Sequence, residues 1–321
     1  MPFGVSTIAI GAASSASGGD IGLFSVTPYT GTGSAQSIVT GQNLTSGSMV
    51  WIKNTTGTFN HEIYDTVRGT GKFLITNSPA VEQTEATSIT AFTSSGVSIG
   101  AWIGVNTIAE SFTIFSWLKR AGFLDIVTYT GNGSNRTINH SLGTIPSLII
   151  VKCTTNAESW AVYHSANTAN PETDRLLLDS DVPTADDATY WNDTSPTSSV
   201  FSVGTSIFVN NSGEDYIAYL FAERAGLSKF GSYVGNYTGV GVSRTVSGVG
   251  FTPKAVLLKK TTSSGNWILA YSEGSNMYYI VPNSTVARTS TTEITFNSDG
   301  FEVTDTTMDN LGSTYIYAAW K

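Results

Sequence analysis

The amino-acid sequence predicts an all-β protein made of three tandem β-sandwich domains of a jelly-roll or lectin-like kind, each about one hundred residues long. The first observation is low charge: 12% of the 321 residues are charged, against about 25% in ordinary soluble domains. The second is composition, because Thr, Ser, Gly and Asn separate strand-forming Val, Ile and aromatic residues. The third is an internal repeat, whose landmarks recur three times in the same order.

The repeat is recognised by landmarks that each copy shares. A Tyr-Thr-Gly-x-Gly motif opens the copies, at residues 29–33, 129–133 and 237–241. An apolar strand that ends in lysine follows, at residues 49–53, 148–152 and 255–259. A Trp-x-x-Tyr strand begins at Trp160 and Trp267, and His61 stands in place of the tryptophan in the first copy. An asparagine then precedes a closing strand with aromatic ends, at Asn106, Asn210 and Asn310 for strands 112–117, 216–221 and 315–320.

The length of one copy sets the expected domain organisation. Several short strands divided by turn residues are typical of a sandwich, in which a second sheet covers the apolar face of the first. Each copy is long enough to enclose its own core, so we expect independent domains, like beads on a string, rather than a continuous solenoid. The predicted ranges are 1–23 for an N-terminal arm or linker and 24–119, 120–225 and 226–321 for the three sandwiches.

Charge and hydropathy argue against several classes of partner. The net charge of −8 comes without a cluster of Lys and Arg, which phosphate contacts require, so we expect no nucleic acid partner. No apolar run approaches the roughly 20 residues of a membrane-spanning helix, so we expect no membrane insertion. The N-terminus lacks the basic start and apolar core of a standard secretory signal. The single cysteine, Cys153, lies in an apolar strand and is predicted to be a small buried side chain.

The residues that could carry chemistry do not converge on a catalytic pattern. His61, His140 and His164 fall at non-equivalent positions in two copies, and the third copy has no histidine. The densest acidic group is Asp179, Asp181, Asp186 and Asp187. Its spacing fits no EF-hand loop, which favours a solvated loop over a calcium site. A carboxylate pair for glycoside hydrolysis stays open, because any two acids can meet in space. We predict no enzymatic activity, no metal and no cofactor.

Aromatic residues outside the repeat pattern are the candidate ligand-binding residues. Tyr190, Trp191, Asn192 and Asp193 form an expected extended stretch in the second copy, and Trp102 follows a glycine in the first. Exposed Trp and Tyr beside Asn and Asp stack on sugar rings and hydrogen-bond to their hydroxyls. Burial of these rings in the sandwich is the alternative.

The pattern of these landmarks resembles the repeat modules of virion proteins from marine bacteriophages, including tail-fibre-like proteins of cyanophages. The resemblance covers residues 24–321 and is clearest over 123–221. It implies lectin-like β-sandwiches in a tail fibre or similar appendage that contributes to host attachment. It further implies assembly in the host cytoplasm, a homotrimer, contact with host-surface glycans, and an N-terminal arm that docks onto other virion proteins.

Two other functions remain open at this point. One is a capsid-decoration protein, or another virion protein that binds no host molecule. The other is a secreted carbohydrate-binding or carbohydrate-active protein. Neither the charge pattern nor the repeat separates these alternatives from a tail fibre.

Overall fold

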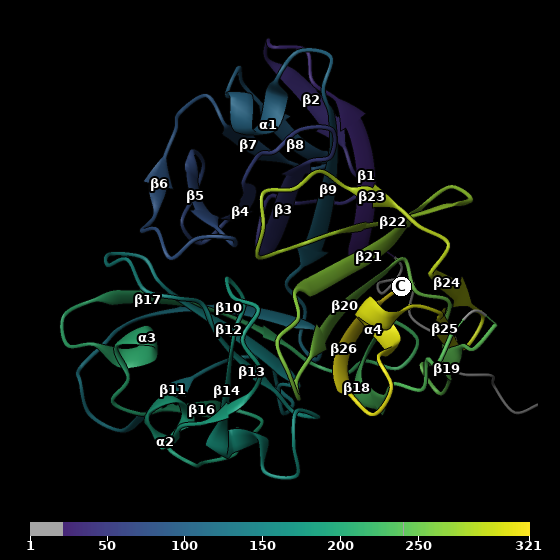
Figure 1. The fold of residues 1–321 in the computed structure, drawn as a ribbon. Coiled ribbons are helices and arrows are strands. Elements are labelled where there is room, and N and C mark those ends of the chain that lie inside the picture. The colour runs from purple at the N-terminus through teal and green to yellow at the C-terminus, as the bar shows by residue number, and fades with distance from the viewer. Residues whose placement is uncertain (1–21, 240) are drawn as a thin grey trace, which may run out of the picture.

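A computed structural model describes residues 22–239 and 241–321. The predicted all-β class is confirmed: antiparallel sheets dominate, and the described helices are single turns (Figure 1). We call residues 24–119, 120–225 and 226–321 the first, second and third repeats. Residues 1–21 of the predicted N-terminal arm lie outside the described residues. None of the described helices has the length and apolar character that crossing a bilayer would require.

Each repeat contributes a six-stranded antiparallel sheet, and the strand order is the same in all three. The sheet of the first repeat runs β1 (Phe24–Thr30), β9 (Ser111–Leu118), β3 (Ser48–Asn54), β4 (His61–Asp65), β5 (Lys72–Ile75), β6 (Gln83–Thr84). The second runs β10 (Leu124–Thr130), β17 (Asp215–Phe221), β12 (Leu148–Cys153), β13 (Ala161–His164), β14 (Asp174–Leu177), β15 (Ala185–Asp186). The third runs β18 (Ser228–Val234), β26 (Thr314–Trp320), β20 (Ala255–Lys260), β21 (Trp267–Glu273), β22 (Asn276–Ile280), β23 (Thr289–Ser290).

A smaller antiparallel sheet and short helices complete each repeat. The small sheets are β2 (Gln36–Val39), β8 (Gly96–Ile99) and β7 (Ile89–Thr93); β11 (Arg136–Asn139) and β16 (Val200–Val203); and β19 (Arg244–Val246), β25 (Gly300–Val303) and β24 (Ile294–Asn297). The helices are α1 (Ile103–Asn106), α2 (Ala188–Trp191), α3 (Ile207–Asn210) and α4 (Thr306–Asp309), with a 3-10 turn η1 (Pro171–Thr173). In each repeat, one apolar cluster joins the small sheet to one face of the large sheet.

The opposite face of each large sheet contributes to one core that all three repeats share. Side chains alternate along a strand, so on β3 Val50 packs in the first repeat's own cluster while Met49 and Trp51 enter the shared core. The expectation of separate beads is therefore wrong at this face. The physical reason is that the central strands are buried on both sides, and the second apolar face must also be covered.

Three equivalent aromatic residues meet in this shared core. Trp117, Phe221 and Trp320 are the last aromatic residues of β9, β17 and β26, and each is almost fully buried. Their ring centroids are 5.4 Å apart for Trp117–Trp320, 5.6 Å for Phe221–Trp320 and 6.1 Å for Trp117–Phe221. The three pairs are edge-to-face, the arrangement that aromatic quadrupoles favour. The repeats thus surround a pseudo-threefold centre, visible as three lobes in Figure 1.

The structure corrects the predicted start of the third repeat. The residue equivalent to Tyr29 and Tyr129 is Tyr233 rather than Tyr237, because each of these tyrosines pairs with the first aromatic residue of the closing strand. The glycine two residues later approaches a carbonyl oxygen so closely that a Cβ would lie 2.0, 2.0 and 2.2 Å away at Gly31, Gly131 and Gly235. In the third repeat, the residue equivalent to the buried Asn106 and Asn210 is likewise Asp309 rather than Asn310.

Candidate functional site

The three repeats meet in pairs along three seams, and each seam is closed by the same contacts. We call them the first–second, second–third and third–first seams. At each one, a buried lysine at the end of a central strand donates to a backbone carbonyl of the neighbouring repeat. The ammonium-to-oxygen distances are 3.1 Å for Lys152 to Pro79, 2.8 Å for Lys259 to Asp181 and 3.0 Å for Lys53 to Thr285. The lysines therefore link the repeats in a closed cycle.

Burial of these lysines is offset by hydrogen bonds. Each also donates to a carbonyl of its own repeat, at 2.7 Å from Lys53 to Phe59 and 2.6 Å from Lys152 to Cys153. Charge-assisted bonds to carbonyl oxygens compensate the lost hydration of an ammonium group. Burial nevertheless lowers the pKa of Lys53, Lys152 and Lys259 to about 8.

A second contact recurs at two of the three seams and uses the Trp-x-x-Tyr strand. The indole N–H of Trp160 donates to Ile75 of the first repeat at 2.9 Å, and that of Trp267 donates to Leu177 of the second at 2.8 Å. His61 takes this position in the first repeat. Its Nδ1 accepts from Trp51 at 3.1 Å, and its Nε2 makes no hydrogen bond of ordinary geometry within the described chain.

One position differs at every seam. In the first–second seam, Asp65 accepts from the hydroxyl of Tyr219 at 2.7 Å and from Nε of Arg68 at 2.6 Å. The equivalent residue in the second repeat is His164, whose Nε2 lies 3.0 Å from the Tyr317 carbonyl of the third. In the third repeat it is Tyr271, whose ring packs edge-on against Phe115 of the first. The three seams thus share the same backbone arrangement but differ in the side chain at this position.

A cleft opens at each seam beside this position. The first–second cleft has a volume of about 560 Å³ and is lined by Arg68, Lys72, Glu82, Thr128, Tyr129, Thr130, Thr154, Thr155, Asp215 and Tyr216. The second–third cleft, of about 490 Å³, is lined by Ala166, Asn167, Thr168, Thr184, Ser232, Thr261, Thr262 and Thr314. The third–first cleft, of about 200 Å³, includes Arg288 and Glu273 in its lining. Ligand pockets commonly occupy about 300–1,000 Å³, so the first two have the volume for a small ligand.

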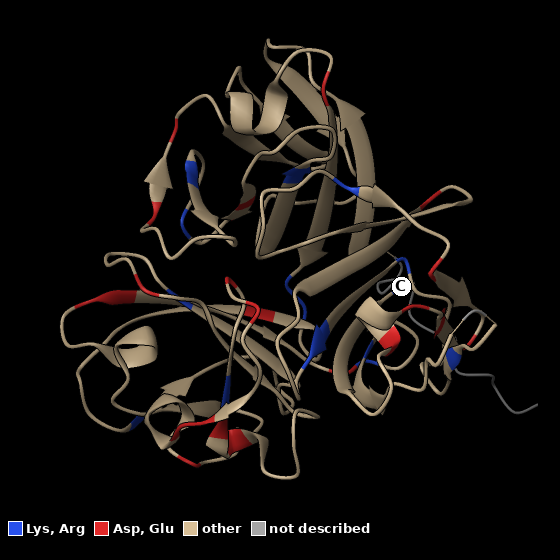
Figure 2. Ribbon diagram, viewed as in Figure 1, with Lys and Arg blue, Asp and Glu red and all other residues tan. Residues whose placement is uncertain are grey.

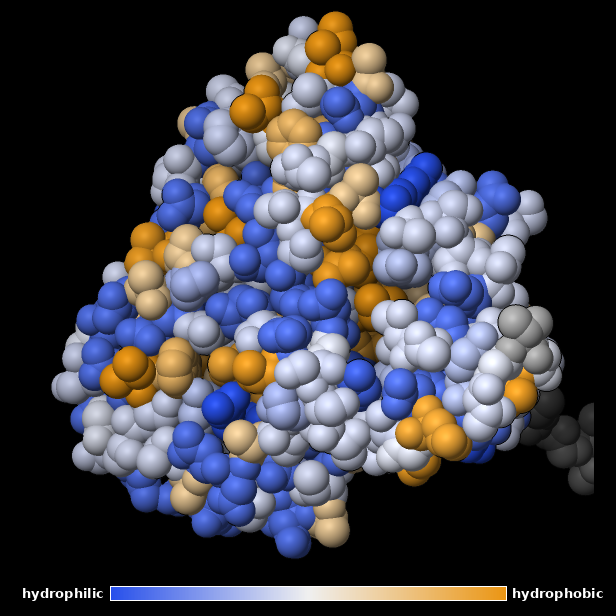
Figure 3. All heavy atoms as spheres, in the orientation of Figure 1, coloured by the Kyte–Doolittle hydropathy of each residue, from blue (hydrophilic) through white to orange (hydrophobic). Residues whose placement is uncertain are grey.

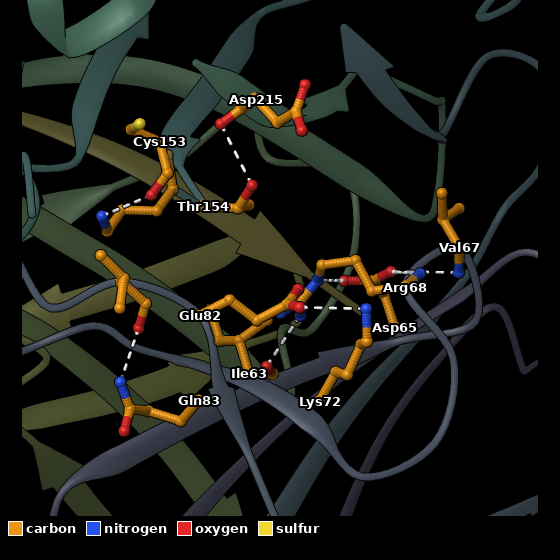
Figure 4. Close-up of polar contacts among 12 residues, drawn as sticks. Ile63, Asp65, Val67, Arg68, Lys72, Glu82, Gln83, Cys153, Thr154 and Asp215 are labelled. Carbon is orange, nitrogen blue, oxygen red and sulfur yellow. Dashed lines mark hydrogen bonds and ion pairs between the residues drawn. The ribbon is translucent and has the colours of Figure 1, made fainter. Parts of the chain in front are cut away.

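The first–second cleft is the candidate site because it combines volume with charged side chains from one repeat and hydroxyls from the next. On the first-repeat wall, Glu82 bridges Lys72 at 3.2 Å and Arg68 at 3.5 Å. On the facing wall, Thr130 donates to Asp215 Oδ1 at 2.7 Å, and Thr154 donates to the Asp215 carbonyl at 3.1 Å. Figure 4 shows the two walls facing each other.

Contacts across the seam hold the two walls in place. The Glu82 amide donates to the Thr154 carbonyl at 2.9 Å, so the loop that carries Glu82 is fastened to the second repeat. Burial acts to lower the pKa of Arg68, but Tyr219, Asp65 and Glu82 outweigh it and raise that pKa. Arg68 is therefore a permanent cation within a buried ion pair, whereas the Lys72 side chain is 46% exposed.

Sequence reasoning missed this cleft, although one signal was present. Arg68 and Asp65 are spaced three apart in a chain with few charges, and Asn167 and Gly274 stand at the position of Arg68 in the other repeats. Figure 2 shows how sparsely charged residues are distributed along the chain. A charge pair present in only one copy of the repeat thus indicated that this copy differs from the others at its contact with a neighbour. That these residues face Asp215 could not be read from the sequence.

The structure does not bring the predicted ligand-binding residues together on a surface. Tyr190 and Trp191 are each 2% exposed and pack in the core of the second repeat. They lie on α2, not in the extended stretch that was expected. The prediction that these two rings stack on a sugar is therefore wrong, because α2 packs against β14 and β16 and turns both rings into that core. Asn192 is half-buried and Asp193 is exposed, both with positive φ at the end of α2.

Trp102 belongs to a buried polar group of the first repeat. Its indole N–H donates to Glu62 Oε1 at 3.0 Å, and its ring packs against the first repeat's own core. Burial raises the pKa of the Glu62 carboxyl to about 7, against the hydrogen bonds from Tyr64 and Trp102, which lower it. Trp102 is thus half-buried with its N–H engaged, and its role in ligand binding stays a prediction.

The other residues considered for chemistry are dispersed. Asp179 Oδ1 accepts from the Trp160 amide at 3.2 Å, and Asp187 caps α2. His164 is buried, and burial lowers its pKa to about 4. Cys153 is fully buried, as predicted. Across residues 22–239 and 241–321, no group of three or more His, Cys, Asp or Glu side chains lies close enough to hold a metal ion.

Comparison with known proteins gives one result that covers nearly the whole chain. The model of the family described as "Domain of unknown function (DUF7483)" matches residues 21–321. No curated protein matches the chain. The matched range contains all three repeats and all three seams. The chain therefore belongs to the DUF7483 family.

Proposed function

We propose that this protein is a non-enzymatic structural protein of a bacteriophage virion, a tail fibre or similar appendage that contributes to host-surface attachment. In this proposal residues 24–119, 120–225 and 226–321 are three tandem lectin-like β-sandwich domains. The proposal starts from the resemblance of the repeat landmarks to marine phage virion modules. The protein would assemble in the host cytoplasm and act on the particle, with its N-terminal arm docked onto other virion proteins.

The observation that carries the proposal is the closed cycle of seams. Lys53, Lys152 and Lys259 each fasten their repeat to a neighbour, so each repeat of the described chain is joined to both of the others. The aromatic centre adds a shared core to this cycle. A body closed in this way supports a mechanical role, because local opening of any repeat must break contacts in two seams.

The surface supports the same proposal. Figure 3 shows a face on which hydrophilic residues and residues of intermediate hydropathy dominate, with apolar residues in several groups, one of which runs through the middle of the face. Hydroxyl and amide side chains supply much of this polarity, since charged residues are 12% of the chain. Such a surface suits hydrogen bonding to a hydrated polymer such as a host glycan, rather than burial in a large apolar interface.

The oligomeric state offers a sharp distinction. The resemblance implies a homotrimer, and three chains around one axis remain part of the proposal. The pseudo-threefold centre formed by Trp117, Phe221 and Trp320 favours a second possibility, in which one chain occupies the place of a trimer. Native mass spectrometry of the full chain separates them: three times 34.0 kDa indicates the homotrimer, and 34.0 kDa indicates the single-chain arrangement.

Attachment is tested with the purified protein and with the particle. We expect the fluorescently labelled protein to bind host cells, and antibodies against it to label the tail in electron micrographs. Labelling of the capsid without cell binding would overturn the proposal in favour of a decoration protein. Release of reducing sugar from host polysaccharide would overturn it in favour of a carbohydrate-active enzyme.

A further inference from the structure

We propose that the cleft between the first and second repeats binds an uncharged saccharide unit. This inference rests on the proposed attachment function and names the site and the ligand class. It places recognition at a seam between repeats and not at Tyr190, Trp191 or Trp102, the aromatic residues that the sequence suggested.

The balance of charge in the cleft favours an uncharged ligand. The lining contains two cations, Arg68 and Lys72, and two anions, Glu82 and Asp215. Arg68 is bound to Asp65 at 2.6 Å and Lys72 to Glu82 at 3.2 Å, so neither cation is left to neutralise a ligand anion. An anionic ligand would have to break one of these pairs, whereas a neutral one would not.

The mixture of donors and acceptors favours a polyol. A sugar hydroxyl both donates and accepts a hydrogen bond. The cleft offers the Lys72 ammonium as a donor and the Asp215 carboxylate as an acceptor. The exposed Thr128 hydroxyl can do both, and the Thr130 hydroxyl, which donates to Asp215, can accept. Thr128 and Thr130 share the face of β10 that carries Ile126 into the shared core, so they point into the seam rather than into their own repeat.

The walls are preorganised, which lowers the entropic cost of binding. The Glu82–Thr154 backbone bond joins them across the seam at 2.9 Å. The Asp65–Arg68–Tyr219 group, buried beneath the cleft, fixes its floor. Polar groups held in this way need little rearrangement when they replace water around a ligand.

The clefts at the other two seams have equivalent backbone positions but different lining residues. In the third–first cleft, Arg288 lies over the Tyr278 ring at 4.0 Å and pairs with Glu273 at 2.7 Å. This arrangement leaves a volume of about 200 Å³. The second–third cleft is nearly as large as the first. However, Asn167 and Thr184 stand at the positions of Arg68 and Glu82, and Thr314 stands at the position of Asp215. The first–second cleft alone, among the seams of the described chain, joins volume to a charged donor and acceptor.

A pair of matched substitutions tests the site. Thr128→Trp places an indole in the first–second cleft, and Ser232→Trp does the same at the equivalent exposed position of the second–third cleft. Both change an exposed residue of an edge strand, so both variants are expected to fold. Near-UV circular dichroism and thermal unfolding of each variant check that expectation.

The probes are glucose, galactose, mannose and N-acetylglucosamine, with N-acetylneuraminic acid and spermidine as charged controls. Binding to the full chain is measured by saturation-transfer NMR and titration. We expect at least one neutral sugar to bind, at least tenfold weaker binding for Thr128→Trp, and unchanged binding for Ser232→Trp. Binding of a charged control instead, equal loss in both variants, or no binding of any neutral sugar would overturn the inference.

Host-cell binding of the same proteins separates this inference from the proposed function. If the unmodified protein and Thr128→Trp bind cells equally well, the cleft is not the contact site while attachment stands. If the protein binds a neutral sugar in the cleft but binds no cells, the cleft inference stands and attachment fails.

Discussion

At one equivalent buried position, the first–second seam has a carboxylate and the third–first seam has an aromatic ring. In the first–second seam, the buried Asp65 carboxylate accepts hydrogen bonds from Arg68 and from the Tyr219 hydroxyl. In the third–first seam, the ring of Tyr271 meets Phe115 edge-on with centroids 5.0 Å apart. The difference shows that the repeat specifies how the sheets meet, while individual residues decide which pairs of repeats fit each other.

This asymmetry gives the three repeats a defined order around their centre. A Tyr271–Phe115 contact satisfies no buried charge, and an Asp65–Arg68 pair placed against Phe115 would lose the Tyr219 hydroxyl. Mismatched seams would therefore leave buried polar groups unsatisfied, at about 1–3 kcal/mol for each group. Because the seams differ from one another, they disfavour the exchange of repeats between chains. Such domain swapping is a characteristic failure of repeat proteins.

The largest effect is expected from removing the buried carboxylate of the first–second seam. Asp65→Ala removes the nearer carboxylate of the buried Arg68 guanidinium and leaves it only Glu82, at 3.5 Å. We expect a loss of about 3–5 kcal/mol in the free energy of unfolding. Tyr219→Phe, which removes the hydroxyl alone, is the matched control and should cost about 1 kcal/mol. Urea unfolding followed by fluorescence measures both. A loss below 1 kcal/mol for Asp65→Ala would show that the polar seam is not held by this pair.

The second–third seam is expected to depend on pH. Burial lowers the folded-state pKa of His164 to about 4, below about 6.5 in the unfolded chain. The unfolded chain therefore binds more protons between these values, and stability falls as the pH drops from about 6.5 to about 4, by about 3 kcal/mol. His164→Gln keeps a donor for the Tyr317 carbonyl but does not titrate, so its stability should fall less over this range. Parallel pH profiles for the two proteins would contradict the assignment.

The cyclic lysines are expected to contribute about 1–3 kcal/mol each at neutral pH. Lys152→Met keeps the length of the side chain but leaves the Pro79 and Cys153 carbonyls without the ammonium group. Lys229→Met, at an exposed surface pair with Glu223, is the matched control and should change stability by less than about 0.5 kcal/mol. Thermal unfolding at pH 7 compares them. Equal effects of the two substitutions would mean that the lysine cycle does not hold the seams.

The sheets could be predicted from the sequence, whereas the way the repeats meet at the seams could not. Strand-forming residues and the threefold recurrence predict the sheets, because alternation and turn chemistry are local properties. The role of Trp117, Phe221 and Trp320 was not predictable, since a strand apolar on both faces does not say which neighbour covers the second face. Tyr190 and Trp191 were misplaced for a related reason: burial of an aromatic ring depends on distant elements. The lysine that ends an apolar strand in every copy was a visible signal of a buried cation.

The smallest effect, and the most specific one, concerns the buried amide shared by the first two repeats but not the third. Asn210 accepts from the Asn132 amide at 3.0 Å and donates to the Ser134 and Gly204 carbonyls at 2.7 and 2.8 Å. Asp309 keeps the first bond, to the Asn236 amide at 2.9 Å, but its Oδ2 is buried without a partner among the described residues. The third repeat therefore lacks a donor at this point.

Asp309→Asn should restore that donor and stabilise the protein by about 1 kcal/mol at pH 7. Burial, together with Asp305, raises the pKa of Asp309 against the Asn236 amide and Arg244, so the folded state binds its proton more tightly than the unfolded state. That contribution to stability is present at low pH and is lost as the pH rises past the unfolded-state pKa. The gain from Asp309→Asn should thus shrink toward pH 3, where a protonated carboxyl supplies the donor itself. Asn210→Asp, the reverse change in the second repeat, should destabilise the protein at pH 7. If Asp309→Asn instead destabilised it, the attraction between Asp309 and Arg244 would outweigh the missing hydrogen bond, and the third repeat would be specialised at this position.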